Sequence, residues 1–393
     1  MQWQDQLESI LAESTDSARA RERQAFDQLA GPWAQSVVLY GAGNLGRKVL
    51  SGLRKHNVDP IAFADANPSL DRKRVHGVPV FPPEVAARRF GREAVFVVCV
   101  WHPDREHGVQ DIIDRLSALG VERVTSFVPL FWKFADAFLP YFFWELPSKL
   151  LAGAGRVRRA CEALDDDSRS LFVSQLHMRT SANFADAGPL SRLPAYFPTD
   201  LFRLHADECF VDCGAFDGDT IREFLFQSGA VFRHIIAFEP DPHNFDRLQS
   251  TLNADQHIRG RATVHKAAVG ELGGTVRFAA TGGDDAAVKA DGEVEIECRT
   301  LDEVIGKENP TFIKMDIEGS ERAALSGGRR TIVSGKPVLA VSIYHQPYDL
   351  WDLPLFMQEL ESDSRLSLRM YWQDGFDLVC FAVPPGRSVN GRT

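Results

Sequence analysis

The segment FVDCGAFDGDT, at residues 210–220, restricts the fold of this chain more than any other stretch. An apolar run ends at Asp212, Gly214 permits a tight turn, and Thr220 begins a stretch with the pattern of a helix. A strand that leads through a glycine turn into a helix is the repeating unit of doubly wound, parallel α/β sheets. Because such sheets bind ligands at the carboxyl ends of their strands, we expect an α/β fold with a ligand site at this turn.

Strands alternate with helices in two parts of the chain, which predicts two doubly wound, Rossmann-like α/β domains joined by a helical linker. The second domain ends in two further strands, and we expect these to form an antiparallel pair. The predicted boundaries are an N-terminal helix at 1–35, a Rossmann-like nucleotide-binding domain at 36–130, the helical linker at 131–205 and the second α/β domain at 206–385.

The acids in the turn of the second domain indicate the charge of its ligand. The turn carries Asp212, Asp217 and Asp219 and has no lysine, so it would repel a pyrophosphate and favour a ligand with positive charge. S-adenosylmethionine offers an ammonium and a sulfonium. Glu239 ends the next apolar strand, 27 residues after Asp212, where a carboxylate can accept both ribose hydroxyls. The two segments together predict a site for a cationic nucleoside.

Several blocks of the C-terminal half resemble the FkbM family of methyltransferases, and the resemblance covers about residues 206–385. It implies a class I S-adenosylmethionine-dependent methyltransferase that O-methylates a sugar, a glycan or a natural product. It also implies that Asp212 and Gly214 line the methionine end of the cofactor, that Glu239 binds ribose and that Ala267 lies near the adenine. The blocks are FVDCGAFDGDT (210–220), AFEPDPHNF (237–245), KAAVGE (266–271), RTLDEV (299–304), FIKMDIEGSE (312–321) and SIYHQPYDLW (342–351).

We expect the cofactor to contact residues that these blocks supply. One departure from the family lies in the insertion TGGDDAAV at 281–288, where members often carry serines but Ala286 and Ala287 offer no hydroxyl. The predicted cofactor-binding residues are Asp212, Gly214, Phe216, Asp217, Gly218, Thr220, Glu239, Pro240, Ala267 and Asp316.

Asp316, Glu318 and His345 are the predicted catalytic residues, because each follows a predicted strand at the same edge of the sheet. Methyl transfer requires alignment of the nucleophile, the methyl group and the sulfur. A hydroxyl nucleophile must also lose its proton, and a histidine that titrates near neutrality suits that task. The same three residues could instead bind a divalent metal, although two oxygens and one nitrogen are a partial ligand set. We predict a base and no metal; a purely structural His345 is the alternative.

The first domain carries GAGNLG between an apolar strand and a helix, and Asp65 follows the next strand 24 residues after Gly41. This is the context of a dinucleotide-binding turn. The domain also resembles the N-terminal nucleotide-binding domains of sugar acetyltransferases and related sugar-modifying proteins, which implies NAD or a nucleotide sugar as ligand. The predicted second site consists of Gly41, Gly43, Asn44, Leu45, Gly46 and Asp65.

Three interpretations of the first domain remain open. The chain could be an NAD(P)-dependent or nucleotide-sugar-binding, sugar-modifying protein that acts through this domain. The domain could instead be a retained scaffold used for dimer packing, or a module that presents the substrate without catalysis.

Composition indicates which binding partners and which cellular compartment to expect. The net charge of −10 argues against a nucleic-acid partner, so a small molecule or glycan is expected, with a homodimer as an option. Six cysteines without paired CxxC units predict reduced thiols in a cytoplasmic protein. We expect no signal peptide and no membrane span, since the run FWKFADAFLPYFFW at 131–144 is short and interrupted by charges. A buried connector is favoured for that run over a partner surface.

Overall fold

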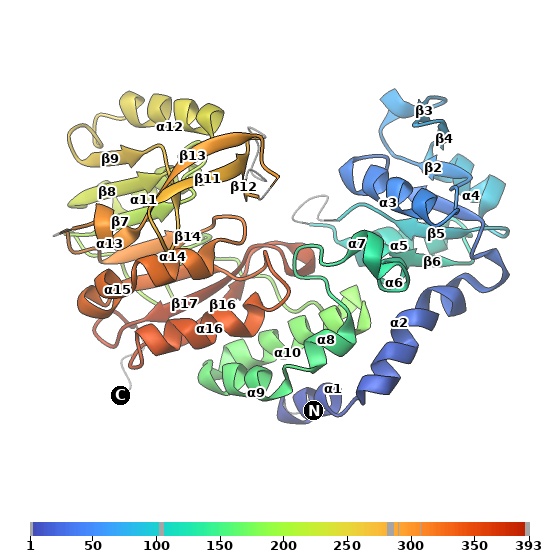
Figure 1. Cartoon of the computed structure of the whole chain (residues 1–393), viewed down its shortest axis with the longest axis horizontal. Helices are drawn as coiled ribbons and strands as arrows, with labels where there is room; N and C mark the ends of the chain where they lie inside the picture. The colour runs from blue at the N-terminus through green and yellow to red at the C-terminus, as the bar shows by residue number, and fades with distance from the viewer. Residues whose placement is uncertain (1–2, 102–105, 281–286, 290, 307, 390–393) are drawn as a thin grey trace.

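The structure is a computed structural model that describes residues 3–101, 106–280, 287–289, 291–306 and 308–389. They form two α/β lobes, with helices from the N-terminus and from the middle of the chain packed beneath and between them (Figure 1). These helices are α1 (Trp3–Leu11), α2 (Thr15–Ala30), α6 (Phe127–Lys133), α7 (Ala135–Phe138), α8 (Pro147–Leu151), α9 (Ala154–Ala163) and α10 (Asp166–Ser181).

The N-terminal lobe holds a six-stranded sheet in the order β3-β4-β2-β1-β5-β6. Its strands are parallel except for β3, which pairs antiparallel with β4. Both β1 and β5 are buried along their whole length, which explains why they are apolar without alternation. The elements are β1 (Val37–Tyr40), α3 (Asn44–Lys55), β2 (Ala62–Ala64), β3 (Arg74–Val75), β4 (Val78–Phe81), α4 (Pro83–Phe90), β5 (Val95–Val98), α5 (Val109–Ala118) and β6 (Val124–Ser126).

The C-terminal lobe holds a seven-stranded sheet in the order β16-β17-β15-β14-β7-β8-β9. Only β17 runs antiparallel to its neighbours, and the strand order reverses between β7 and β14. The predicted α/β fold with a terminal antiparallel pair is therefore confirmed. The elements are β7 (Cys209–Cys213), α11 (Asp219–Ser228), β8 (His234–Phe238), α12 (Pro242–Ala254), β9 (Ala262–His265), β14 (Phe312–Met315), α14 (Glu321–Gly327), α15 (Arg329–Gly335), β15 (Val338–Ser342), α16 (Asp349–Leu360), β16 (Arg365–Met370) and β17 (Leu378–Val383).

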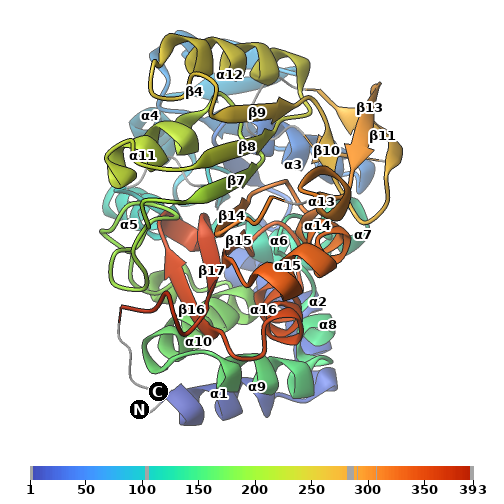
Figure 2. The ribbon, with the colours of Figure 1, turned by 90° about the vertical axis from the view of Figure 1, so that its left-hand side faces the viewer.

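A small second sheet stands beside this lobe (Figure 2). Its strand order is β10-β13-β11-β12, and β11 pairs antiparallel with β13. The elements are β10 (Ala268–Val269), β11 (Gly274–Ala279), β12 (Ala287–Val288) and β13 (Val294–Arg299), followed by α13 (Leu301–Val304). Ala286, singled out in the sequence, lies outside the described residues.

The predicted N-terminal helix is divided in the structure. The single helix expected at 1–35 is wrong: α1 ends at Leu11, and the side chain of Ser14 accepts a hydrogen bond from Ser17 N at 3.1 Å, which caps α2. A serine that can cap the following turn favours a new helix start over continuation of the old one. In the predicted helical linker, Gly153 lies between α8 and α9 and is the N-cap residue of α9.

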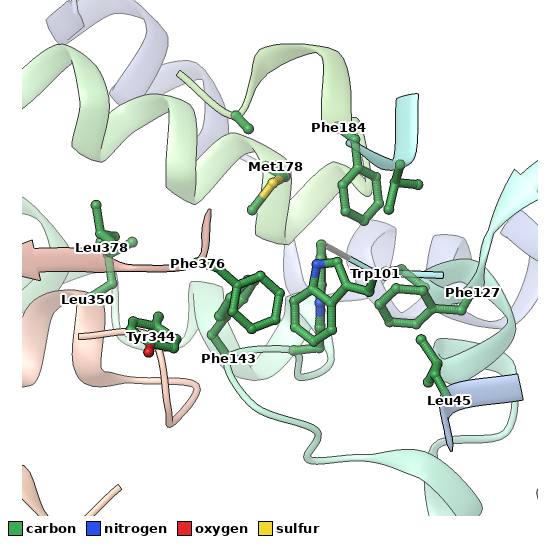
Figure 3. Packing of buried hydrophobic residues seen from close by; sticks show 14 of the residues in the cluster. Leu45, Trp101, Phe127, Phe143, Met178, Phe184, Tyr344, Leu350, Phe376 and Leu378 are labelled. Carbon is green, nitrogen blue, oxygen red and sulfur yellow. The ribbon is translucent and has the colours of Figure 1, made fainter. Parts of the chain in front are cut away.

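One hydrophobic core passes through both lobes and through the linker. Trp101, after β5, packs against Phe376 of the C-terminal lobe with ring centroids 4.3 Å apart and against Phe143 of the linker at 5.1 Å (Figure 3). Phe131 and Trp144 belong to the same core, so the run at 131–144 contributes to a buried connector, as predicted. The lobes are therefore held together by apolar packing as well as by the chain.

Two expectations from composition can be compared with the described residues. All six cysteines are buried and free of disulfides. In the described part of the chain, no helix has both the length and the apolar composition needed to cross a bilayer.

Candidate functional site

A cavity of about 440 Å³ lies at the carboxyl ends of β7, β8 and β14, where the strand order reverses. This is the position at which open α/β sheets bind ligands. Seven of the ten predicted cofactor-binding residues line it: Gly214, Phe216, Thr220, Glu239, Pro240, Ala267 and Asp316.

Gly214 allows the ends of two neighbouring strands to approach closely. Its φ of +83° lies in the left-handed region, and a Cβ atom there would lie 1.9 Å from the carbonyl oxygen of Asp316. A side chain at position 214 would therefore push the turn after β7 away from the segment after β14, and it would disturb the cavity wall that both supply.

Asp212 does not line the cavity, although the sequence places it at the methionine end of the cofactor. It is fully buried, and its Oδ1 lies 3.0 Å from Nζ of Lys314, which faces it in the parallel register of β7 and β14. Burial raises the pKa of Asp212 to about 6, against the opposing effect of Lys314. The same Nζ donates a hydrogen bond to the carbonyl oxygen of Gly214 at 2.7 Å. The turn after β7 has no lysine of its own, but Lys314 of the neighbouring strand β14 lies against it.

Asp217 and Gly218 do not line the cavity either. The carboxylate of Asp217 pairs with Arg222 at 2.9 Å, and Gly218 packs against Thr251 of α12. Asp219 at the start of α11 is the acid of this turn that lines the cavity. The crevice is therefore less acidic than the sequence of the turn indicates.

Glu239 follows β8 and is buried to 5% exposure at the cavity wall. Its two carboxylate oxygens accept hydrogen bonds from the backbone N–H groups of Phe216 and Asp241, both at 2.8 Å. Burial raises the pKa of Glu239 to about 7, and the two N–H donors oppose this rise. The backbone thus fixes the orientation of the carboxylate, and each oxygen retains a lone pair that can accept a further donor.

The cavity has walls of two kinds. The wall formed by the small sheet and its approach is apolar, with Ala267, Ala268, Val269, Phe278, Ala287 and Val288. The wall formed by the linker and the segments after β14, β15 and β16 is aromatic and acidic, with Phe142, Tyr196, Asp316, Glu318, Tyr344, Trp372, Phe376 and Asp377. The first wall suits a heteroaromatic base, and the second suits a polar acceptor.

His345 lies behind the acidic wall and does not line the cavity. It is 4% exposed, and its Nδ1 lies 2.8 Å from Oε1 of Glu321, while its Nε2 lies 3.4 Å from both Asp316 Oδ1 and Glu318 Oε1. Burial alone would lower the pKa of His345, but the negative charges of Glu321 and Glu318 and the hydrogen bond with Glu321 raise that pKa well above its ordinary value. This environment does not suit the neutral base proposed from the sequence.

Asp316 and Glu318 differ in proton affinity. Burial would raise the pKa of Asp316, but Lys314, His345 and a hydrogen bond from the hydroxyl of Tyr196 at 2.8 Å together lower it. Burial raises the pKa of Glu318, and the nearby charge of His345 only partly opposes this rise. Glu318 is therefore the stronger base of the two and lies on the cavity wall.

Several site residues were not predicted from the sequence. Lys314 and Glu321 stand inside the block FIKMDIEGSE and could have been found there, since charged residues next to a buried strand need partners. Phe142 and Tyr196 come from the linker and carry no motif. Packing between distant segments brings them to the cavity.

The glycine turn of the N-terminal lobe begins α3, as predicted. A Cβ atom at Gly46 would lie 1.9 Å from the carbonyl oxygen of Gly41, which explains the last glycine of the motif. The carboxylate of Asp65 accepts a hydrogen bond from the backbone N–H of Ala42 at 2.7 Å, and Leu45 packs into the shared core (Figure 3). The carboxylate of Asp65 thus binds the backbone of the glycine turn at Ala42. That a nucleotide binds at this site stays a prediction.

Comparison with known proteins shows which protein family this chain resembles. A family model described as the methyltransferase FkbM domain matches residues 212–366. The 2-O-methyltransferase NoeI of Sinorhizobium fredii (strain NBRC 101917 / NGR234) is 25% identical over 150 residues, which cover 32% of this chain and 59% of NoeI. The chain therefore matches less than two thirds of the length of that relative.

A solved structure shares the whole arrangement. The crystal structure of methyltransferase FkbM from Methylobacillus flagellatus KT aligns with a TM-score of 0.77 at 24% identity and covers 97% of this chain and 99% of that one. Both lobes and the linker therefore belong to one shared fold.

Proposed function

Residues 212–366 form a methyltransferase FkbM domain, and on this basis we propose that the chain is an S-adenosylmethionine-dependent methyltransferase that acts on a hydroxyl oxygen. The observation that carries the proposal is the cavity at the strand reversal, with Glu239 on one wall and Asp316 and Glu318 on another. The match to NoeI, which is described as a 2-O-methyltransferase, supports oxygen as the acceptor atom.

The donors and acceptors of the cavity suit a nucleoside without phosphate groups. Lys314 is the one basic side chain among the described residues of the lining, and it is already paired with Asp212. The Glu239 carboxylate can accept hydrogen bonds from a ribose diol, as the acid after the second strand does in nucleotide-binding sheets. The apolar wall around Ala267 and Phe278 can cover an adenine ring.

The chain's own groups would supply alignment and proton transfer. When bound, S-adenosylmethionine supplies the methyl group, which passes from its sulfonium sulfur to the acceptor oxygen and leaves S-adenosylhomocysteine. The cavity walls would hold the acceptor oxygen in line with the methyl group. Glu318 would take the proton of the acceptor hydroxyl as that oxygen is methylated, because burial raises the pKa of Glu318 and this residue lies on the wall.

The acceptor that we propose is a sugar, a glycan or a natural product with a comparable hydroxyl. Phe142, Trp372 and Phe376 offer aromatic faces on the same wall as the carboxylates of Glu318 and Asp377. Aromatic faces can cover the apolar side of a sugar ring, while carboxylates accept hydrogen bonds from its hydroxyls.

Calorimetry with S-adenosylhomocysteine tests the cofactor site. We expect Glu239→Gln to weaken binding about 10- to 100-fold, since it removes a charged hydrogen-bond acceptor that is worth about 1.5–3 kcal/mol. The matched control is Asp246→Asn, which also neutralises one acid but lies on the exposed side of α12. Failure of the wild-type chain to bind S-adenosylhomocysteine, or equal binding by the two variants, would overturn the assignment.

A further inference from the structure

The acidic wall of the cavity contains a buried nitrogen with no hydrogen-bond partner. Nε2 of His345 makes no hydrogen bond to any described residue, although the side chain is almost completely buried. It points between Asp316 Oδ1 and Glu318 Oε1, each 3.4 Å away. Two atoms that bind one divalent ion at about 2.1 Å lie roughly 3–3.5 Å apart, so the distance from Nε2 to each of the two oxygens is compatible with ligands of one ion.

Glu321 holds the imidazole ring in the orientation that a metal ligand requires. It lies 2.8 Å from Nδ1 of His345, and both side chains are buried. The same carboxylate accepts a hydrogen bond from the backbone N–H of Ile317 at 2.9 Å, so it is itself fixed. A histidine that binds a metal through one nitrogen almost always donates from the other nitrogen to a carboxylate or carbonyl.

The charges of the cluster also favour a dication. Asp316, Glu318 and Glu321 surround one imidazole, and an oxygen of Asp316, an oxygen of Glu321 and a ring nitrogen of His345 all lie within 4.8 Å of one another. Three carboxylates thus meet one imidazole, and Lys314, whose charge also acts on Asp316, is paired with Asp212. Buried charges are paired or bind metals.

We propose that His345 Nε2, Asp316 and Glu318 bind a divalent cation, with Glu321 as the residue that positions the ring. The inference rests on the proposed function and deepens it. Asp316 and Glu318 line the cavity, so the ion would have an open position toward the acceptor. Coordination of the acceptor hydroxyl would lower the pKa of that hydroxyl, and its proton would leave to the Glu318 oxygen that does not bind the ion.

The test uses the full chain without a histidine tag. After removal of metals with EDTA, Mn²⁺ is added at neutral pH, and free Mn²⁺ is measured by electron paramagnetic resonance. We expect about one bound ion per chain in the wild type and none in His345→Ala. Glu321→Gln should weaken binding about 10- to 100-fold, as expected for a residue that orients a ligand. Glu318→Gln, a shape-conserving change on the cavity wall, should also weaken Mn²⁺ binding. This second variant keeps the test decisive if His345→Ala does not fold.

The matched control is His177→Ala. Nδ1 of His177 lies 3.6 Å from Asp186 on the surface, so the variant removes a histidine beside an acid outside the cluster. Equal Mn²⁺ binding by folded His345→Ala and His177→Ala, or no binding by the wild type, would overturn the metal site. Calorimetry with S-adenosylhomocysteine on the same samples separates the two claims, because cofactor binding without Mn²⁺ binding refutes only the metal site.

Discussion

The carboxylate of Asp374 accepts a hydrogen bond from the backbone N–H of Val109 at 2.9 Å, although 265 positions separate the two residues. Asp374 lies in the turn between β16 and β17 of the C-terminal lobe, and Val109 begins α5 of the N-terminal lobe. A carboxylate at a helix start satisfies a free N–H group and interacts favourably with the helix dipole. The contact therefore joins the two lobes by a directed polar interaction at the edge of their apolar core.

The burial of Asp374 should make stability depend on pH. Burial raises the pKa of Asp374 to about 6 from an ordinary 3.8, and the hydrogen bond from Val109 only partly opposes this. The folded protein thus holds the proton more tightly than the unfolded chain. The resulting stabilisation is complete below about pH 4 and is lost as the pH rises through 6.

Asp374→Asn isolates this effect, because the variant cannot titrate at that position. We expect the free energy of unfolding of the wild type, measured against the variant by urea titration, to fall by up to ~3 kcal/mol between pH 4 and 7. A difference between the two proteins that stays constant over this range would contradict the prediction.

Gly214→Ala should damage both stability and cofactor binding. The left-handed backbone costs about 1 kcal/mol for alanine, and the contact with the Asp316 carbonyl adds about 1–3 kcal/mol. Gly229→Ala is the matched control, since Gly229 has a φ of +60° but no atom within 4 Å of the added Cβ. In urea titrations, Gly214→Ala should lose more unfolding free energy than Gly229→Ala. Equal losses of unfolding free energy would mean that the close approach of the two strands at Gly214 is unimportant.

Tyr196→Phe should reduce turnover more than cofactor affinity. The variant removes the hydroxyl that donates to Asp316 at 2.8 Å, so a carboxylate on the acceptor wall loses a partner. A hydrogen bond to a charged group contributes about 1.5–3 kcal/mol, and loss of part of it corresponds to a decrease in kcat of roughly tenfold. Tyr348→Phe, at a more exposed tyrosine, is the control. An unchanged kcat in Tyr196→Phe would mean that the Tyr196 hydroxyl has no role in the reaction.

Asp65→Ala tests the N-terminal glycine turn. The variant leaves the N–H of Ala42 without its carboxylate, and we expect a loss of about 0.5–2 kcal/mol in unfolding free energy with unchanged affinity for S-adenosylhomocysteine. Addition of NADH or a nucleotide sugar to the wild type provides the opposing test. A rise in melting temperature with either compound, absent in Asp65→Ala, would establish a nucleotide site there.

The sequence predicted the local units of the C-terminal sheet well. β7 and β8 end within one residue of Asp212 and Glu239, where the sequence predicts the ends of two strands, because each is a mainly apolar run followed by a turn. Gly214, Glu239 and Asp316 could be assigned to the cavity for the same reason, since the end of a strand fixes which edge of the sheet a residue occupies.

The features that the sequence alone does not reveal concern long-range partners. Whether Asp212 faces a ligand or a neighbouring strand depends on Lys314, and only the parallel register of the two strands shows that they meet. Likewise, the proton affinity of His345 follows from Glu321, which the fold places 2.8 Å away. Side-chain partners of this kind depend on pairing that local periodicity does not encode.

The packing of Trp101 on Phe376 restricts how this architecture can be divided or recombined. A fragment that starts at residue 206 would leave Phe376 without its aromatic cover, and exposed apolar surfaces of this kind promote aggregation. A chimaera with a foreign N-terminal lobe would need a large aromatic side chain at the position of Trp101. The catalytic lobe is consequently poorly suited to modular exchange.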